Sequence, residues 1–429
     1  MSSKWYKIDN AGKIFPTVYS KEERSSFRLS AVLKDEVDEH LLKIALTKAL
    51  QRFPTFNVKL RRGFFWYYLE NNTKEPIVEL DRNIFSKITL KSEDEYLFKL
   101  TYYGKRVALD IFHAITDGKG GMEFFKCILY YYFELLGGIF ENKGEILTHE
   151  LEQYYDEKED SFLKNYNKCD VIKFDEPKVH KIKNVRMYGK GRFGVYHTIM
   201  SVSKVKEVCK KYDCTVTQYI ASCLLQSIYQ NEYNDLTKDD IYTLFVTVNA
   251  RKYFNSKTLR NFALFIRSGS KFKDNMEFID FVNESKRFFT KELTKERMQS
   301  RIVQNVNIEK NFFVRALPLF LKILVMKIGY KFLADDLDTM NFSNLGPVVC
   351  PEGFEKYVER FEFVLGASKS LPMGVTAVSY NDTLVMTASL ACLEKNLLKK
   401  VIDQFVKDDI TCTIEMNDLE VEDEEMFKL

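Results

Sequence analysis

Along all 429 residues, short apolar runs with the two-residue period of a strand alternate with longer segments of helical spacing. The segment Glu36–Phe53 places its apolar residues near one face of a helix, and Pro54 stops that helix. The run RVALDIF, Arg106–Phe112, has the composition of a strand. This alternation argues against an all-α or all-β chain. It predicts an α/β fold in which mixed sheets are flanked by helices.

The composition changes between about Asn142 and Arg192, which makes this stretch the best candidate for a connection between two halves. The second half then opens as the first does, because the strand pattern of Val195–Ser203 leads into a helical pattern. A further helical pattern follows, in which Thr215 and Gln218 have capping-box spacing. The sequence therefore predicts an N-terminal α/β subdomain at 1–175, a linker at 176–192 and a C-terminal α/β subdomain at 193–429.

Charge and cysteine usage narrow the class of protein. Lys plus Arg number 64 and Asp plus Glu 61, so the net charge of +3 lacks the basic excess of a nucleic-acid binder. A basic stretch at Val179–Arg192 is either a solvated linker or a contact for an anionic group. The eight cysteines are dispersed without a C-x-x-C pair, which is typical of reduced thiols.

The sequence predicts a cytoplasmic protein. The N-terminus, MSSKWYKIDNAGK, lacks the apolar core of a signal peptide. No stretch approaches the run of about 18 apolar residues that a spanning helix needs. One segment, Phe312–Phe332, is strongly apolar with cations every few residues. It is compatible with a helix on a membrane surface, with the wall of an apolar substrate channel, or with a core helix whose lysine stems emerge from the protein.

The stretch FHAITDGKGG, Phe112–Gly121, places one of only five histidines at the end of a predicted strand. A neutral imidazole with a pKa near ~6.5 can take a proton from a hydroxyl or an amine. Asp117 can orient it by touching the ring, or can fix the loop by pairing with a distant cation. His113 and Asp117 are four residues apart, but the glycines at 118, 120 and 121 argue against a helix that would join them at a metal ion. We expect no metal site, and the spacing alone leaves a structural role for His113 open.

HAITDG resembles the H-x-x-x-D-G signature of the chloramphenicol-acetyltransferase-like superfamily, which includes condensation domains, plant acyl-CoA acyltransferases and alcohol acetyltransferase-like proteins. Further stretches in the same order resemble elements of this family: Leu50–Phe56, Phe245–Phe262 and Asn341–Phe354. Phe112 replaces the first histidine of the condensation-domain H-H motif, and the D-F-G-W-G motif of the plant enzymes is absent. The resemblance is therefore strongest to the free-standing alcohol acetyltransferase-like branch.

The resemblance implies two acetyltransferase-like subdomains with an active-site tunnel between them. His113 would be the general base that deprotonates the acceptor as it attacks a thioester carbonyl. Asp117 would pair with Arg251 of the second half instead of touching substrate, and Gly118 and Arg251 would support the site.

Three residues of the late S-N-x-G stretch, Ser343, Asn344 and Gly346, match positions near the developing oxyanion or the acceptor. The implied activity is direct acyl transfer from acyl-CoA, as a co-substrate and not a bound cofactor, to a small-molecule alcohol or amine, without an acyl-enzyme. A monomer could hold the whole site. A non-catalytic binder of acyl thioester, lipid or a partner protein is the alternative, and peripheral membrane contact through 312–332 is a further possibility.

Overall fold

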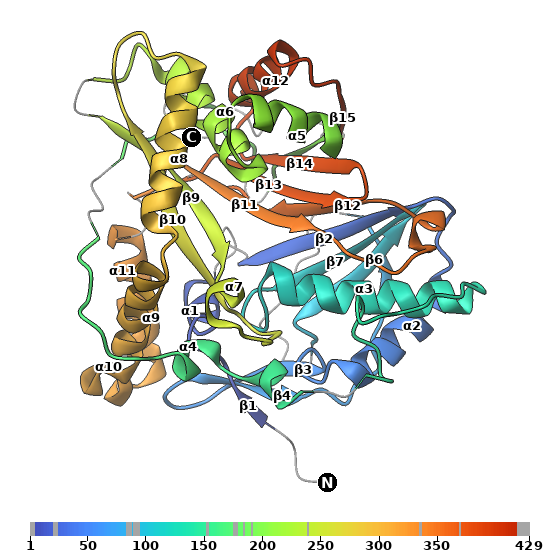
Figure 1. Cartoon of the computed structure of the whole chain (residues 1–429). Coiled ribbons are helices and arrows are strands. Elements are labelled where there is room, and N and C mark those ends of the chain that lie inside the picture. The colour runs from blue at the N-terminus through green and yellow to red at the C-terminus, as the bar shows by residue number, and fades with distance from the viewer. Residues whose placement is uncertain are drawn as a thin grey trace.

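The computed structural model describes residues 5–417 except 20–24, 83–87, 89–94, 152–153, 175–178, 183–184, 190–191, 238–239, 334–336 and 369, and of 328–333 only the backbone (Figure 1). The α-helices are α1 (Ile14–Val18), α2 (Glu39–Arg52), α3 (Gly118–Leu135), α4 (Ser161–Lys164), α5 (Val202–Lys211), α6 (Val216–Glu232), α7 (Arg251–Phe254), α8 (Phe278–Glu292), α9 (Lys295–Lys310), α10 (Phe312–Ala316), α11 (Leu319–Leu333) and α12 (Asn396–Lys407). Short 3-10 helices cover Tyr155–Lys158 and Phe354–Lys356. The strands are β1 (Trp5–Lys7), β2 (Ser26–Leu33), β3 (Val58–Arg62), β4 (Tyr67–Asn71), β5 (Val78–Leu80), β6 (Phe98–Tyr103), β7 (Arg106–Phe112), β8 (Gly194–Ser201), β9 (Ile241–Asn249), β10 (Ala263–Lys271), β11 (Met340–Pro347), β12 (Val358–Leu365), β13 (Met373–Tyr380), β14 (Thr383–Leu390) and β15 (Cys412–Met416).

These strands form a five-stranded sheet of order β12-β2-β7-β6-β5, a seven-stranded sheet of order β10-β9-β11-β13-β14-β8-β15, and a small sheet of order β1-β4-β3. The two larger sheets are mixed, because β5 runs parallel to β6, and β11 runs parallel to both β9 and β13. The predicted α/β fold of mixed sheets flanked by helices is therefore confirmed.

Local signals placed several elements correctly. The predicted strand at 106–112 is β7, and the helix predicted over 36–53 is α2, capped by the Asp38 side chain. Thr215 and Gln218 form the predicted capping box at the start of α6, where each side chain accepts from the other residue's backbone N–H.

One strand of the five-stranded sheet comes from the C-terminal part of the chain. β12 comes from the late part of the chain but pairs antiparallel with β2, at the edge of the five-stranded sheet (Figure 1). Residues 358–365 thus complete the sheet that carries β7. The subdomain boundaries at 175 and 193 stay a prediction, and part of the predicted linker 176–192 lies outside the described residues.

Each large sheet has its own apolar core. One core gathers buried side chains of β2, β7, α2 and α3, such as Leu29, Leu109 and Phe125. The other gathers those of α6, α12 and the seven-stranded sheet, such as Tyr219 and Val401. Burying one such side chain completely contributes about 1.5–3 kcal/mol, so each core can hold its own sheet and helices together.

The apolar segment 312–332 differs from its core-helix interpretation. It is split into α10 and α11 at Leu317 and Pro318. Phe312 and Phe320 are exposed, whereas Lys322, expected to emerge from the protein, is buried. The core interpretation is wrong for the described side chains, because Phe312, Phe313 and Phe320 face solvent. Among the described residues, no helix has both the length and the hydropathy that a bilayer span requires.

Candidate active site

The corner between β7 and α3 carries His113 and Asp117. β7 ends at Phe112, and α3 begins at Gly118 with Asp117 as its N-cap. The prediction that no helix joins His113 to Asp117 is confirmed, since these residues form a turn and a loop and the helix begins only at Gly118. The Asp117 side chain accepts the backbone N–H of Gly120 at 3.1 Å, so capping stabilises a first turn whose glycines have low helix propensity.

The glycines permit close packing by the chain itself. A Cβ on Gly120 would collide with the carbonyl oxygen of Leu259, which the Thr116 hydroxyl contacts at 2.6 Å. A Cβ on Gly118 would lie 2.7 Å from the side chain of Leu345 on β11. The first turn of α3 is therefore where two segments of the second half meet the first half.

Asp117 and Arg251 form the ion pair that the family resemblance implied. The guanidinium donates to both carboxylate oxygens at 2.8 and 3.0 Å, and the backbone N–H of Phe262 donates at 2.8 Å. Burial acts to raise the pKa of Asp117, but the charge of Arg251 and these hydrogen bonds bring it below its ordinary value. Asp117 is thus an ionised carboxylate of the first half that is bonded to Arg251 and Phe262 of the second half.

Asn261 fixes the tautomer of His113. Its amide nitrogen donates to the Asp9 carboxylate at 3.2 Å and to the His113 carbonyl at 3.0 Å, both of which only accept. Its amide oxygen must therefore be the atom 2.9 Å from His113 Nδ1, and a neutral ring donates its Nδ1 proton there. The lone pair of a neutral imidazole is then on Nε2. Among the described residues, none makes a hydrogen bond to Nε2.

Aromatic rings pack around the same imidazole. Phe15 of α1 stacks on it at 4.3 Å between centroids, and Phe27 of β2 meets it edge-on at 5.1 Å. Burial lowers the pKa of His113, against the opposing effects of the Asp117 charge and the Asn261 hydrogen bond. The ring is therefore held neutral at neutral pH, in the state that can accept a proton.

Sequence reasoning missed several of these neighbours. Asn261 lies within the stretch 245–262 that carries the family resemblance, so a signal for it was present. Asp9 and Phe15 lie about a hundred residues from the histidine in an unremarkable N-terminal segment, and nothing local marks them. Asp9 is fully buried and also accepts the backbone N–H of Gly12 at 2.6 Å.

The remaining predicted residues lie on β11. Ser343 Oγ is 2.5 Å from Thr247 Oγ1, and the Asn344 amide donates to Thr217 Oγ1 at 2.9 Å. The Asn344 oxygen accepts the backbone N–H of Gly346, whose φ is +75° and which lies where the strand register shifts between Asn344 and Pro347. None of these bonds reaches His113. β11 nevertheless approaches the corner, since Leu345 packs against Gly118.

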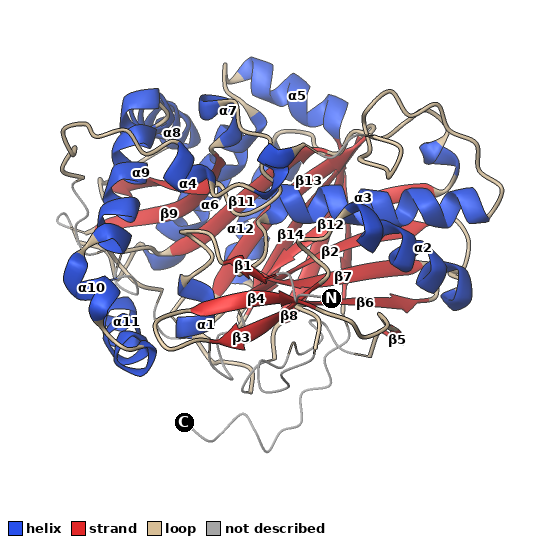
Figure 2. Cartoon of the chain, turned by 90° about the horizontal axis from the view of Figure 1, so that it is seen from below, coloured by secondary structure: helices blue, strands red, loops and turns tan. Residues whose placement is uncertain are grey.

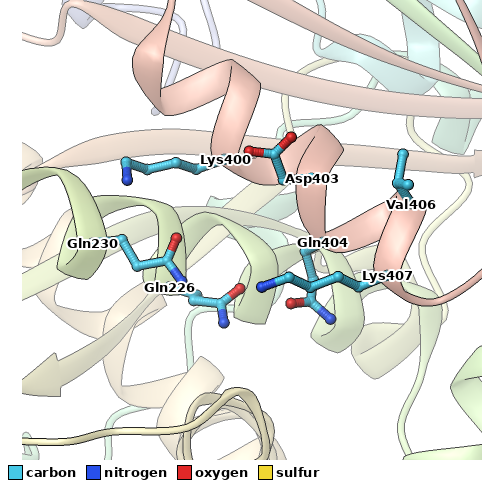
Figure 3. Close-up of a pocket in the computed structure, with 7 residues that line it drawn as sticks. All are labelled: Gln226, Gln230, Lys400, Asp403, Gln404, Val406 and Lys407. Atoms are coloured by element: carbon cyan, nitrogen blue, oxygen red, sulfur yellow. The ribbon is translucent and has the colours of Figure 1, made fainter.

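Two cavities in the described part of the chain contain none of the predicted site residues. One of about 320 Å³ lies between α6 and α12 (Figure 3), and its lining is mostly polar: Gln226, Gln230, Lys400, Asp403, Gln404, Val406 and Lys407. A second, of about 170 Å³, includes His197 and Glu362. The tunnel implied by the resemblance therefore stays a prediction.

Within the described ranges, no cluster of three or more His, Cys, Asp or Glu could ligate a metal. Two cations of the basic stretch have partners in the protein: Lys181 donates to the Asp338 carbonyl and Arg186 pairs with Glu394. All eight cysteines are free thiols.

Solved structures show the fold that surrounds this site. The chain matches polyketide synthase associated protein 5 from Mycobacterium tuberculosis with a TM-score of 0.61 and 12% identity, over 93% of this chain and 96% of that one. It matches the starter condensation domain of rhizomide synthetase RzmA, crystallised as a mutant with C8-CoA, with a TM-score of 0.62 and 11% identity over 94% of each chain.

A third match is TRI101 of F. sporotrichioides, complexed with coenzyme A and T-2, with a TM-score of 0.61 and 11% identity over 96% of this chain and 100% of that one. The sequence matches no protein-family model, and it matches no curated protein. The chain therefore has the two-subdomain fold of these condensation and acyltransferase structures.

Proposed function

We propose that this protein is an acyltransferase that moves an acyl group from coenzyme A to an alcohol or amine, with His113 as general base. One observation carries the proposal. The neutral ring of His113 donates its Nδ1 proton to a fixed amide oxygen and so keeps a lone pair on Nε2. A base for acyl transfer needs this state, and base catalysis of this kind contributes about 10²–10⁴-fold.

The reaction follows from that lone pair. Nε2 takes the proton of the acceptor O–H or N–H while the acceptor atom forms a bond to the thioester carbonyl carbon. The carbonyl electron pair moves to oxygen and gives a tetrahedral oxyanion. When the carbonyl re-forms, the carbon–sulfur bond breaks, and the imidazolium returns its proton to the thiolate of coenzyme A. The bonds balance without an acyl-enzyme, a metal or a redox partner.

Asp117 and Arg251 act in this mechanism as positioning residues. The carboxylate oxygens of Asp117 accept hydrogen bonds from Arg251 and from backbone N–H groups. Asp117 therefore does not compete with His113 for the proton of the acceptor. The pair joins α3 to the segment after β9, and that segment carries Asn261. Holding these parts together keeps the Nδ1 bond of His113 in place.

The strand β11 is the proposed source of oxyanion stabilisation. Ser343 carries a hydroxyl and Asn344 a second amide hydrogen, whereas the backbone N–H of Gly346 is already bonded to Asn344. β11 packs on the first turn of α3 through Leu345. A donor aimed at the developing charge is worth about 3 kcal/mol. Coenzyme A as donor is supported by the coenzyme A complexes among the structures of the same fold.

The test is thiol release from acetyl-CoA and a medium-chain acyl-CoA, with a panel of alcohols and amines. We expect acceptor-dependent release, with the acylated acceptor detected by mass spectrometry. Tight binding of acyl-CoA without turnover over the whole panel would replace this proposal with the non-catalytic binder.

A further inference from the structure

Large apolar side chains project into solvent at one end of the molecule. They come from the turn between β3 and β4, from α10 and from α11. The exposed fractions of the largest are 71% for Phe64, 75% for Phe312, 78% for Phe313 and 61% for Phe320. We define the apolar surface as these residues with Phe65, Leu321, Leu324 and Val325, all of them exposed.

Hydrogen bonds join the three elements into one surface. The backbone N–H of Leu319 donates to the Phe64 carbonyl at 2.8 Å. The ammonium of Lys322 donates to the carbonyls of Phe65 and Arg315 at 3.0 and 3.1 Å. The turn, α10 and α11 are therefore held together by direct bonds.

The buried side chain of Lys322 stabilises this arrangement of the turn, α10 and α11. Its side chain is buried, and its ammonium lies 4.4 Å from the centroid of the Trp66 ring. A buried ammonium is stable only when partners replace its water, and here two carbonyls and an aromatic face do so. Lys322 therefore joins the turn, α10 and α11 through its buried ammonium, while the aromatic side chains of the same elements face solvent.

The exposed charged side chains within the segments that form the apolar surface are cationic. Arg62, Arg315 and Lys327 are exposed beside it. The sequence contains no Asp or Glu between 58 and 69 or between 312 and 333. Aromatic side chains flanked by cations, with no acidic residue in the same segments, complement the interface of an anionic bilayer. Such a bilayer attracts each nearby Lys or Arg by about 1 kcal/mol.

The shape of the elements also favours a membrane over a protein partner. The five-residue helix α10 and α11 lie at one edge of the molecule in both views (Figures 1 and 2), and the turn between β3 and β4 is bonded to α11. With 15 residues, α11 is shorter than the roughly 20 that span a bilayer, so it suits the plane of the interface.

We propose that the apolar surface docks this protein peripherally on an anionic lipid membrane. Its aromatic side chains enter the headgroup region, and Arg62, Arg315 and Lys327 contact lipid phosphates. α1 packs against α11 and carries Phe15, which stacks on His113. Docking therefore holds the His113 site beside the bilayer. If the proposed function holds, an amphipathic acceptor would enter the site from the membrane. The docking itself does not depend on the proposed function.

The test is co-sedimentation of the full chain with vesicles of phosphatidylcholine containing about one-third phosphatidylserine. We expect binding, and we expect Phe312→Ser with Phe313→Ser to weaken it at least about tenfold. Phe320→Ser with Leu324→Ser repeats the test on α11. Ile139→Ser is the matched control, because Ile139 is 95% exposed in the loop after α3 and outside the apolar surface. It is expected to bind as the unchanged protein does.

A charge series separates electrostatic from apolar contributions. Arg62→Glu and Arg315→Glu are each expected to weaken binding to the anionic vesicles about fivefold or more. Binding to pure phosphatidylcholine vesicles should change less. The assay contains no acyl-CoA, so its result is independent of enzymatic activity. Failure to sediment with anionic vesicles would overturn the docking, as would self-association in ultracentrifugation that the Phe312→Ser, Phe313→Ser change abolishes.

Discussion

Two histidines lie where the halves of the molecule meet, and their surroundings differ. At His113, Nδ1 bonds to a neutral amide and the nearby carboxylate is held by Arg251. At His197 on β8, Nδ1 lies 2.9 Å from Thr387 Oγ1, and Nε2 lies 3.6 Å from the Glu362 carboxylate on β12. A carboxylate facing the ring is therefore not what distinguishes the candidate base. The difference is that His113 has one nitrogen fixed and the other uncommitted among the described residues.

The charges around His197 belong to a structural junction. Burial acts to raise the pKa of Glu362, but His197, Arg106 and Arg360 hold it at about 2. Burial also lowers the pKa of His197, so at neutral pH the two arginines supply the positive charge. Glu362 belongs to the five-stranded sheet and His197 to the seven-stranded sheet, so this contact joins the two sheets, whereas Asp117–Arg251 joins α3 to α7.

The largest expected effect is on stability at the His113 site. Arg251→Ala leaves a buried carboxylate unpaired and should lower the free energy of unfolding by about 3–5 kcal/mol. Arg106→Ala at the other junction should cost less, about 1–2 kcal/mol, because Glu362 keeps its bond to Arg360. Urea unfolding measures both. Equal losses would show that the two junctions do not differ as described.

A double-mutant cycle checks the Asp117–Arg251 pair itself. Asp117→Asn should also destabilise the protein, and Asp117→Asn with Arg251→Ala should cost less than the sum of the single changes, because each residue loses the same partner. Additive losses would contradict coupling between the two side chains.

The next largest effect is on turnover. His113→Ala should lower kcat for acyl transfer at least about a hundredfold, because it removes the base. The matched change His197→Ala should lower kcat less than about threefold, since that ring serves the junction. Thiol release with any accepted alcohol or amine measures both. A comparable loss in His197→Ala would remove the distinction between the two histidines.

A smaller effect is expected from the tautomer anchor. Asn261→Ala removes the acceptor of His113 Nδ1 and should lower kcat about tenfold. The hydrogen bond to Asn261 raises the pKa of His113, so its loss should move the acid limb of the pH–rate profile to lower pH. Thr387→Ala, the corresponding change beside His197, should leave that limb in place. An unmoved limb in Asn261→Ala would argue against His113 as the titrating base.

The smallest effect concerns pH and stability, and both histidines contribute to it. Burial lowers the pKa of His113 and of His197 below the ordinary value near ~6.5. The unfolded chain therefore takes up protons first, and stability should fall as the pH drops below about 6.5. Unfolding at a series of pH values measures the slope. His113→Gln and His197→Gln should each flatten it, and a slope unchanged by both would contradict the lowered values.

Local sequence carried much of the fold and only part of the site. Strand periodicity placed β7, and the Thr215–Gln218 spacing placed the start of α6, because both depend on neighbours within a few residues. The family resemblance led to the Asp117–Arg251 contact, while the roles of these residues in a reaction remain proposals. The helix start at Gly118 was missed, because its glycines pack against the distant Leu259 and Leu345.

By itself, the sequence determined the alternation of helices and strands and the presence of one histidine at a strand end, because periodicity and caps are local. Only the tertiary structure decided that Asn261 orients that histidine, that Phe15 covers it and that β12 joins the first sheet. It also decided that the apolar side chains of α10 and α11 face solvent. These outcomes depend on which distant segments pack together, and the spacing of nearby residues does not determine the free energy of such contacts.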